Sequence, residues 1–206
     1  MLSWNVLGVV VWVLIILYLV FVVQNIRKRH IRMIIKLHKN FSWSTLALDL
    51  VEIVIFLVAA IWMFNRSFLD NPDLENQTLI TSKTSYTPLI LTPASKNSYY
   101  VTISSAKRKI ASQTYSFYKA GNRVTVSSNN ATIAVGKDPL NVDAQKIPFS
   151  RNKLQQVDHR YQRAYVATYT ATYRNNWQNG LGLHAGHVAS RFYLIRVPDQ
   201  SFVRQK

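Results

Sequence analysis

Two long apolar runs dominate the first third of the chain. The first run covers residues 2–23 and carries no charge, and the second covers residues 46–64 and carries two acids, Asp49 and Glu52. About 20 apolar residues are enough to cross the hydrocarbon core of a bilayer. The pattern therefore predicts a membrane protein that begins with a two-helix transmembrane hairpin, joined by a basic loop over residues 24–45.

After this hairpin the pattern changes to short segments that are typical of β-strands. They are rich in β-branched and aromatic residues and cover residues 99–105, 110–118, 123–128, 131–135, 164–173 and 191–197. Short strands separated by turns predict a mainly-β domain, either a sandwich or a partly open barrel. Residues 65–77 are polar and predict a juxtamembrane linker, so we expect the β domain over residues 78–206. Residues 152–163 are the one part of this domain in which we expect a helix.

The distribution of charge predicts an orientation for the hairpin. Residues 1–64 carry a net charge of +4 and residues 65–206 carry +12. The basic residues of the hairpin all lie in its connecting loop, and they are Arg27, Lys28, Arg29, Arg32, Lys36 and Lys39. Short loops rich in lysine and arginine stay in the cytoplasm, next to an anionic leaflet. We therefore expect the loop on the cytoplasmic side of the plasma membrane, with the N-terminus and the β domain extracytoplasmic.

One face of each span carries the residues expected to join the two helices. Gly8 and Tyr18 share a face of the first span, and Asp49, Glu52 and Ala59 share a face of the second. A turn between the two apolar runs places Gly8 near Ala59 and Tyr18 near the two acids. Small residues permit close helix packing. Acids within a membrane indicate either a structural hydrogen bond, here to Tyr18, or a cation site or partner-helix contact.

The residues that usually carry catalysis form no convincing set in this sequence. The chain has no cysteine, which excludes thiol nucleophiles and cysteine zinc sites. Ser-x-x-Lys occurs at Ser104, Ser116 and Ser150, but the accompanying motifs of penicillin-binding enzymes are missing. His184 and His187 have no evident further ligand for a metal. We therefore expect neither a metal nor a cofactor, and a role other than catalysis.

Basic charge and tyrosine recur together in the predicted β domain. Ten of the eleven tyrosines follow residue 64, and the basic residues closest to them or most densely grouped are Lys107, Arg108, Lys109, Arg160, Arg163 and Arg174. Such a surface binds polyanions by charge and by stacking. The alternative is a generally basic surface whose tyrosines pack the core, since Tyr165, Tyr169 and Tyr173 share one face of a strand. No motif for sequence-specific nucleic-acid binding is present.

The overall plan resembles two-span membrane proteins of lactic-acid bacteria, with a β-rich outer domain that is rich in lysine, tyrosine and asparagine. The resemblance rests on the plan and composition of the whole chain and not on a specific motif, and it implies no activity and no site residue. We expect a membrane-anchored envelope protein whose outer domain binds anionic cell-wall polymer or another membrane protein. The alternatives are an envelope hydrolase or transferase with a Ser/Lys/His site formed only by the fold, and an accessory subunit of a membrane complex.

Overall fold

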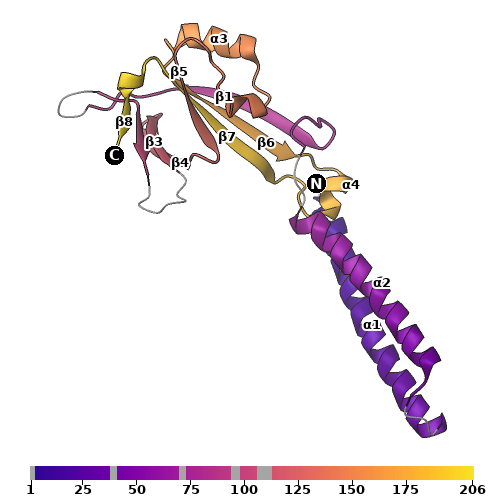
Figure 1. The fold of residues 1–206 in the computed structure, drawn as a ribbon. Coiled ribbons are helices and arrows are strands. Elements are labelled where there is room, and N and C mark those ends of the chain that lie inside the picture. The colour runs from indigo at the N-terminus through magenta and orange to yellow at the C-terminus, as the bar shows by residue number, and fades with distance from the viewer. Residues whose placement is uncertain (1–2, 38–40, 70–72, 94–97, 106–112) are drawn as a thin grey trace. The chain divides into compact units, whose positions relative to one another are not determined.

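The computed structural model describes residues 3–37, 41–69, 73–93, 98–105 and 113–206 (Figure 1). The chain divides into two compact units, each formed from two stretches of sequence. The first, here the membrane unit, consists of Met1–Pro72 and Tyr173–His187. The second, here the β unit, consists of Asp73–Thr172 and Val188–Lys206. The expected outer domain at 78–206 therefore contributes a short internal segment to the membrane unit.

Two long helices make up most of the membrane unit. Helix α1 spans Asn5–Leu37 and helix α2 spans Trp43–Phe68, and both are long and apolar enough to cross a membrane. The basic segment expected as a loop is helical as far as Leu37, because residues 24–37 contain no glycine or proline and many good helix formers. Helix α2 likewise continues into the expected linker. The turn of the hairpin therefore lies between Leu37 and Trp43.

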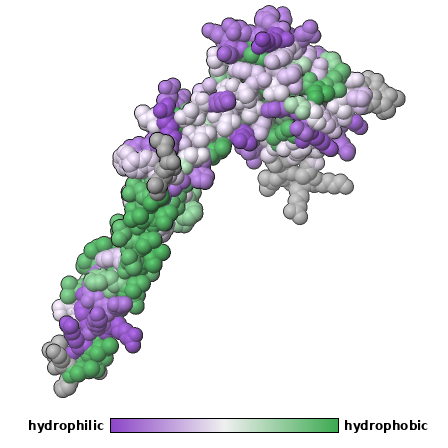
Figure 2. Space-filling view, turned by 180° about the vertical axis from the view of Figure 1, so that it is seen from behind, coloured by the Kyte–Doolittle hydropathy of each residue, from purple (hydrophilic) through white to green (hydrophobic). Residues whose placement is uncertain are grey.

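This later turn changes which residues of the two helices meet. The positions that lie least exposed recur at helical spacing, such as Val22 and Met33 of α1 and Asp49 and Met63 of α2. Contacts between the helices pair Asn25 with Glu52 and Trp12 with Ser67. The outward surface of the hairpin is largely apolar, with a hydrophilic band toward the end where the helices join (Figure 2).

A short segment of the membrane unit packs on the N-terminal end of α1. It contains helix α4, Trp177–Leu181, which begins at the side-chain cap of Asn176. The Asn5 side chain donates to the Ala185 carbonyl at 3.1 Å and accepts from its N–H at 2.9 Å. Gly8 lies so close that an added Cβ would meet the Gly180 carbonyl oxygen at 2.6 Å. The glycine expected to contact Ala59 therefore contacts the backbone of α4 instead.

The β unit consists of two four-stranded sheets that do not close into a barrel (Figure 1). The first sheet has the order β1-β6-β7-β5, formed by Ile80–Pro88, Tyr165–Tyr173, Val188–Val197 and Ala131–Val135. The second has the order β4-β3-β2-β8, formed by Asn122–Ser127, Thr114–Lys119, Val101–Ser104 and Val203–Gln205. Both sheets are mixed, because β5 pairs with β7 in parallel and β2 pairs with β8 in parallel.

The two sheets share one apolar core. Its buried residues come from both sheets and from the end of β1, and they are Leu89, Val101, Phe117, Ala131, Val166, Ile195 and Val197. Helix α3, Arg151–Arg160, covers the opposite face of the first sheet, where Leu154 is fully buried and the Tyr161 and Tyr165 rings lie 6.1 Å apart. Both faces of β6 are therefore buried, and its Tyr165 packs beneath α3.

Candidate functional site

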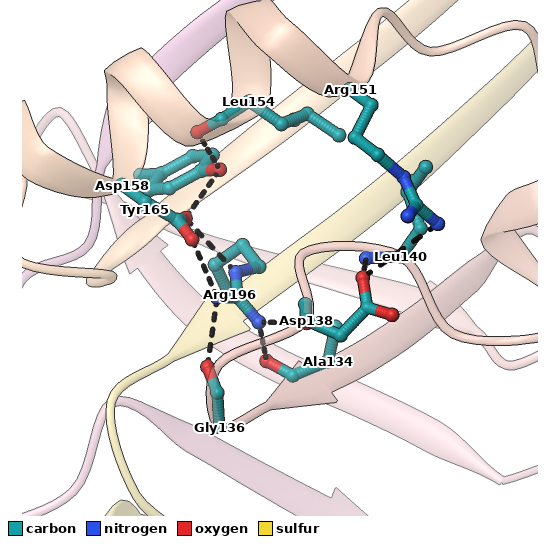
Figure 3. Close-up of polar contacts among 9 residues, drawn as sticks. All are labelled: Ala134, Gly136, Asp138, Leu140, Arg151, Leu154, Asp158, Tyr165 and Arg196. Atoms are coloured by element: carbon teal, nitrogen blue, oxygen red, sulfur yellow. Dashed lines mark hydrogen bonds and ion pairs between the residues drawn. The ribbon is translucent and has the colours of Figure 1, made fainter.

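A buried arginine joins helix α3 to the first sheet (Figure 3). Arg196 of β7 has no exposed surface. Its Nε donates to Asp158 Oδ1 at 3.1 Å, and its Nη2 donates to Asp158 Oδ2 at 2.7 Å. Its remaining N–H groups donate to three carbonyl oxygens at the end of β5 and just after it, those of Ala134, Gly136 and Asp138, at 3.2, 3.0 and 2.9 Å. All five donors of the guanidinium group are therefore used.

Asp158 is as fully engaged as its partner. Its Oδ1 also accepts from the Tyr165 hydroxyl at 2.8 Å. Burial and the Asp158 carboxylate together raise the pKa of the Tyr165 phenol well above its ordinary value. Because every strong donor and acceptor here already has a partner, this cluster has no group left to move a proton or to attack a substrate. We call Arg196, Asp158 and Tyr165 the closed cluster, and its role is to hold α3 on the sheet.

A different part of the β unit presents basic side chains with tyrosine. On the second sheet, Val101, Phe117 and Val203 point into the core, so their neighbours along each strand point away from it. Thr102 lies between Ser116 and Arg204 in the strand register, which forms a polar row across three strands. The surface formed around this row is a small hollow of about 190 Å³.

The residues around this hollow make it strongly basic. It is lined by Tyr99, Thr102, Ser116, Tyr118, Arg123, Arg204 and Lys206, and among these described lining residues there is no acid. The Arg204 guanidinium carbon lies 5.4 Å from the centre of the Tyr99 ring, a cation–π geometry that orients the arginine. Arg123 is the register partner of Tyr118. We call this surface the basic sheet face, and its chemistry suits an anionic group flanked by a ring or sugar.

Of the basic residues named from the sequence for polyanion binding, the three that the structure describes do not line one hollow. Lys107, Arg108 and Lys109 lie outside the described residues. Arg163 lines a second hollow beside α3, while Arg160 is exposed on α3 and does not line that hollow. Arg174 belongs to the membrane unit.

Sequence reasoning missed the three cations of the basic sheet face because they are far apart in the chain. For Arg123 the pattern held a usable signal, since alternation over residues 122–127 places it with Thr125 opposite Val124. Arg204 and Lys206 lie in and just after a strand of three residues, which is too short to show a pattern. Only the pairing of β8 with β2 brings them to Tyr99.

The Ser-x-x-Lys matches that the structure describes do not form catalytic pairs. Ser116 and Lys119 are three positions apart on β3 and therefore point to opposite faces. The Ser116 hydroxyl lies 3.0 Å from that of Thr125, and the Lys119 amine donates to Thr168 at 3.3 Å. Burial and the charge of Arg191 lower the pKa of Lys119, but no serine hydroxyl is paired with it. Ser150 instead caps α3 by accepting from the Lys153 N–H.

The histidines that the structure describes do not form a metal-binding arrangement. Among the residues that the structure describes, no three His, Cys, Asp or Glu side chains come together as a possible metal site. His184 stacks on Tyr173 with ring centres 5.0 Å apart, and its Nε2 is buried. This pair packs within the segment that contacts α1.

The acids of the hairpin have partners other than Tyr18. Arg29 Nη2 lies 2.8 Å from Asp49 Oδ1 and 2.5 Å from Glu52 Oε2. His30 Nε2 lies 3.0 Å from Asp49 Oδ2, and Asn25 donates to Glu52 at 2.7 Å. These residues form the hairpin cluster. The pairing expected with Tyr18 fails because α1 continues past the first apolar run and carries Arg29 to the level of the acids.

This cluster also changes where the apolar band of the hairpin lies. Charge-free residues run from Val6 to Val23 on α1 and from Ile53 to Phe64 on α2. The run on α1 rises roughly 27 Å and the run on α2 roughly 18 Å, whereas the hydrocarbon core is about 30 Å thick. Asp49 and Glu52 directly precede the charge-free run of α2, and both carboxylates pair with Arg29 within the hairpin.

Comparison with known proteins identifies the chain at the level of its family. Neither the curated proteins nor the solved structures gave a match. Residues 3–204 match a protein-family model described as ":-like", a description that assigns no activity. The family is named after a locus of a lactic-acid bacterium, in agreement with the resemblance drawn from the sequence. The match covers both the membrane unit and the β unit, and the chain therefore belongs to this family.

Proposed function

We propose that this protein is a membrane-anchored component of the cell envelope whose β unit binds an anionic polymer through the basic sheet face. The observation that carries the proposal is the gathering of Arg123, Arg204 and Lys206 around Tyr99 and Tyr118, without an acid among the described lining residues. The chain as a whole is also strongly basic, with a net charge of +16. A polyanion gains affinity from such a surface mainly by releasing its counterions.

The proposed location follows from the hairpin. Two spans return the chain to its starting side, so the N-terminus of α1 and the β unit lie on one side of the membrane. The contact of Asn5 with Ala185 agrees with this, because it joins the N-terminal end of α1 to the segment between β6 and β7. Arg27, Lys28 and Arg32 are exposed at the other end of the apolar band. Because basic segments prefer the cytoplasm, that end lies on the cytoplasmic side of the plasma membrane and the β unit is extracytoplasmic.

The geometry of the basic sheet face indicates the kind of polymer. The three cations lie around a small hollow formed by residues of neighbouring strands on one face of the second sheet, which suits a chain that passes across the sheet. The tyrosine rings and the hydroxyls of Thr102 and Ser116 offer stacking and hydrogen bonds to units between the charges. A phosphate-linked or acidic sugar polymer of the envelope has this alternation of charge and polar unit.

The proposal is tested with the full chain in nanodiscs of zwitterionic lipid. The probes are fluorescently labelled linear polyphosphate and poly(glycerol phosphate), followed by anisotropy over a range of salt concentrations. The variant R123Q/R204Q/K206Q should weaken binding at least tenfold. It should also reduce the slope of log affinity against log salt by roughly 2, as expected for about three lost phosphate contacts on a flexible chain.

A matched control separates a site from general charge. The variant K83Q/K146Q/K153Q removes the same charge from exposed lysines that do not line the basic sheet face. It should keep at least half of the binding affinity of the unmodified chain. Equal weakening by the two triple variants, or no binding of either polymer at low salt, would overturn the proposal.

A further inference from the structure

The β unit contains a second hollow, separate from the basic sheet face, beside the C-terminal end of α3. It measures about 510 Å³, within the range that takes a small-molecule ligand. Its lining is Lys137, Gln155, Asp158, His159, Gln162, Arg163 and Pro198. We propose that this hollow binds a small anion of monosaccharide size that carries one phosphate or carboxylate group and several hydroxyls.

The electrostatics of the hollow favour an anion although an aspartate lines it. Asp158 is the one acid in the lining, and both of its oxygens already accept hydrogen bonds from Arg196. The buried guanidinium offsets the charge of this carboxylate. Lys137 and Arg163 therefore give the open space a positive potential, and His159 adds a further ring N–H donor beside them.

The closed cluster fixes the backbone that carries three basic residues of the hollow. Lys137 lies between Gly136 and Asp138, whose carbonyl oxygens both accept from Arg196. His159 follows Asp158 in α3, and the Arg163 N–H donates to the Asp158 carbonyl at 3.0 Å. Each of these three residues is thus one bond or one residue away from the cluster. A site on a backbone that is fixed in advance loses less entropy when its ligand binds.

The backbone of the turn after α3 adds an independent indication. Gln162 and Arg163 both have positive φ angles, of 50° and 61°, although neither is glycine. Left-handed non-glycine residues cost on the order of 1 kcal/mol and tend to occur at binding sites. The turn places both side chains in the lining of the hollow. Gln155 and Gln162 can then donate to and accept from the hydroxyls of a sugar or polyol.

The experiment uses the full chain in zwitterionic nanodiscs, with glucose 1-phosphate, glucuronate and glucose as probes in isothermal titration calorimetry. The two anions should bind saturably, and uncharged glucose should bind at least tenfold more weakly. The variant R163G removes one cation and also relieves the positive φ, so it keeps the fold. It should weaken binding of both anions about tenfold or more.

The control is R160Q, because Arg160 lies on the same helix but does not line the hollow. It should change the affinity for glucose 1-phosphate less than twofold. A free sugar phosphate and the end of a polymer carry the same group, so a competition with poly(glycerol phosphate) distinguishes them. Displacement only in proportion to chain ends indicates end recognition, and no displacement indicates a free ligand.

Two outcomes would overturn this inference. One is the absence of saturable binding of either anion at 10 mM, on the order of the weakest useful affinity for such a ligand. The other is equal weakening by R163G and R160Q, which would indicate general charge. Because the basic sheet face is unchanged in both variants, failure here leaves the polymer-binding proposal standing, and failure of that proposal leaves this one standing.

Discussion

Both units of the protein contain an arginine paired with carboxylates, and the two pairs differ in how completely they are closed. In the β unit, the Arg196 side chain is fully buried and the Asp158 side chain is 10% exposed. In the membrane unit, the Arg29 and Glu52 side chains remain 20% and 19% exposed. Every donor of Arg196 has a partner, whereas Arg29 Nε is buried without a hydrogen bond.

The difference shows what each pair can do for its unit. A buried ion pair gives little net stability compared with apolar packing, but removal of one member leaves a charge that neither water nor a partner can solvate. The closed cluster fixes α3 and the chain after β5 only while both of its charged members are present. In the hairpin cluster the Arg29 and Glu52 side chains remain partly exposed, so water can replace a lost partner there. This cluster orders the two helices without being essential to them.

The largest effect is expected from Asp158→Asn in the closed cluster. The buried guanidinium of Arg196 then loses its counter-charge, and the β unit should lose about 3–5 kcal/mol of stability. Hydrogen exchange of peptides from β6 and β7, read by mass spectrometry, measures this. Tryptophan fluorescence does not report on this unit, because all five tryptophans lie in the membrane unit, at positions 4, 12, 43, 62 and 177.

A double replacement provides the control for this prediction. The variant R196M/D158L removes both charges and leaves similar volume, so it should be markedly more stable than Asp158→Asn. If the double variant is less stable than the single one, the hydrogen bonds of Arg196 to the β5 exit carbonyls matter more than charge balance. The difference between the two clusters would then lie in the hydrogen bonds of the arginine and not in how completely its charge is paired.

The next largest effect concerns alkaline pH and Tyr165. The folded state raises the pKa of this phenol, and burial also raises the pKa of Tyr86, Tyr115 and Tyr169. Above the ordinary phenol pKa of 10.0, the unfolded chain releases protons that the folded chain keeps, so stability should fall as pH rises. The shift at Lys119 acts in the opposite direction near the same pH, but it is a single group.

The variant Tyr165→Phe should make the alkaline loss of stability less steep. Hydrogen exchange of β7, followed between about pH 9 and 11, measures this, because that range covers roughly one unit on either side of the ordinary phenol pKa. Tyr169→Phe is the matched variant, because burial also raises its pKa but Ser82 opposes the shift. It should change the pH dependence less. An equal change in both variants would show that burial alone, and not the Asp158 carboxylate, governs the titration of Tyr165.

The sequence indicated the helices and strands better than it indicated the clusters. The two apolar runs, the helix at residues 152–163 and the face shared by Tyr165 and Tyr169 follow from local periodicity, and the structure contains all of them. The closed cluster joins Asp158 to Arg196, which lie in a helix and in a strand separated by β6. No local pattern brings them together. An arginine between Ile195 and Val197, at the apolar end of β7, was the one available signal of a buried charge.

The pairing within the hairpin was missed for a different reason. Hydropathy marks where apolar residues end, but a helix ends where its capping and turn residues lie. The basic residues after Val23 are good helix formers, so α1 continues to Leu37 and moves the turn. The helix faces could therefore be predicted, whereas the residues that meet across them could not. Arg29 meets Glu52 only because of this continuation.

The smallest effect is expected from Glu52→Gln in the hairpin cluster. The amide keeps one hydrogen bond to Asn25 or Arg29, and Arg29 keeps Asp49, so the pairing of the helices should weaken by about 1 kcal/mol or less. Hydrogen exchange of residues 46–64 in nanodiscs should rise no more than about fivefold, which corresponds to that energy at 25 °C. The control Arg32→Gln removes an exposed cation outside the cluster and should leave exchange unchanged. A loss of protection as large as that from Asp158→Asn would show that the hairpin cluster is as closed to water as the cluster in the β unit.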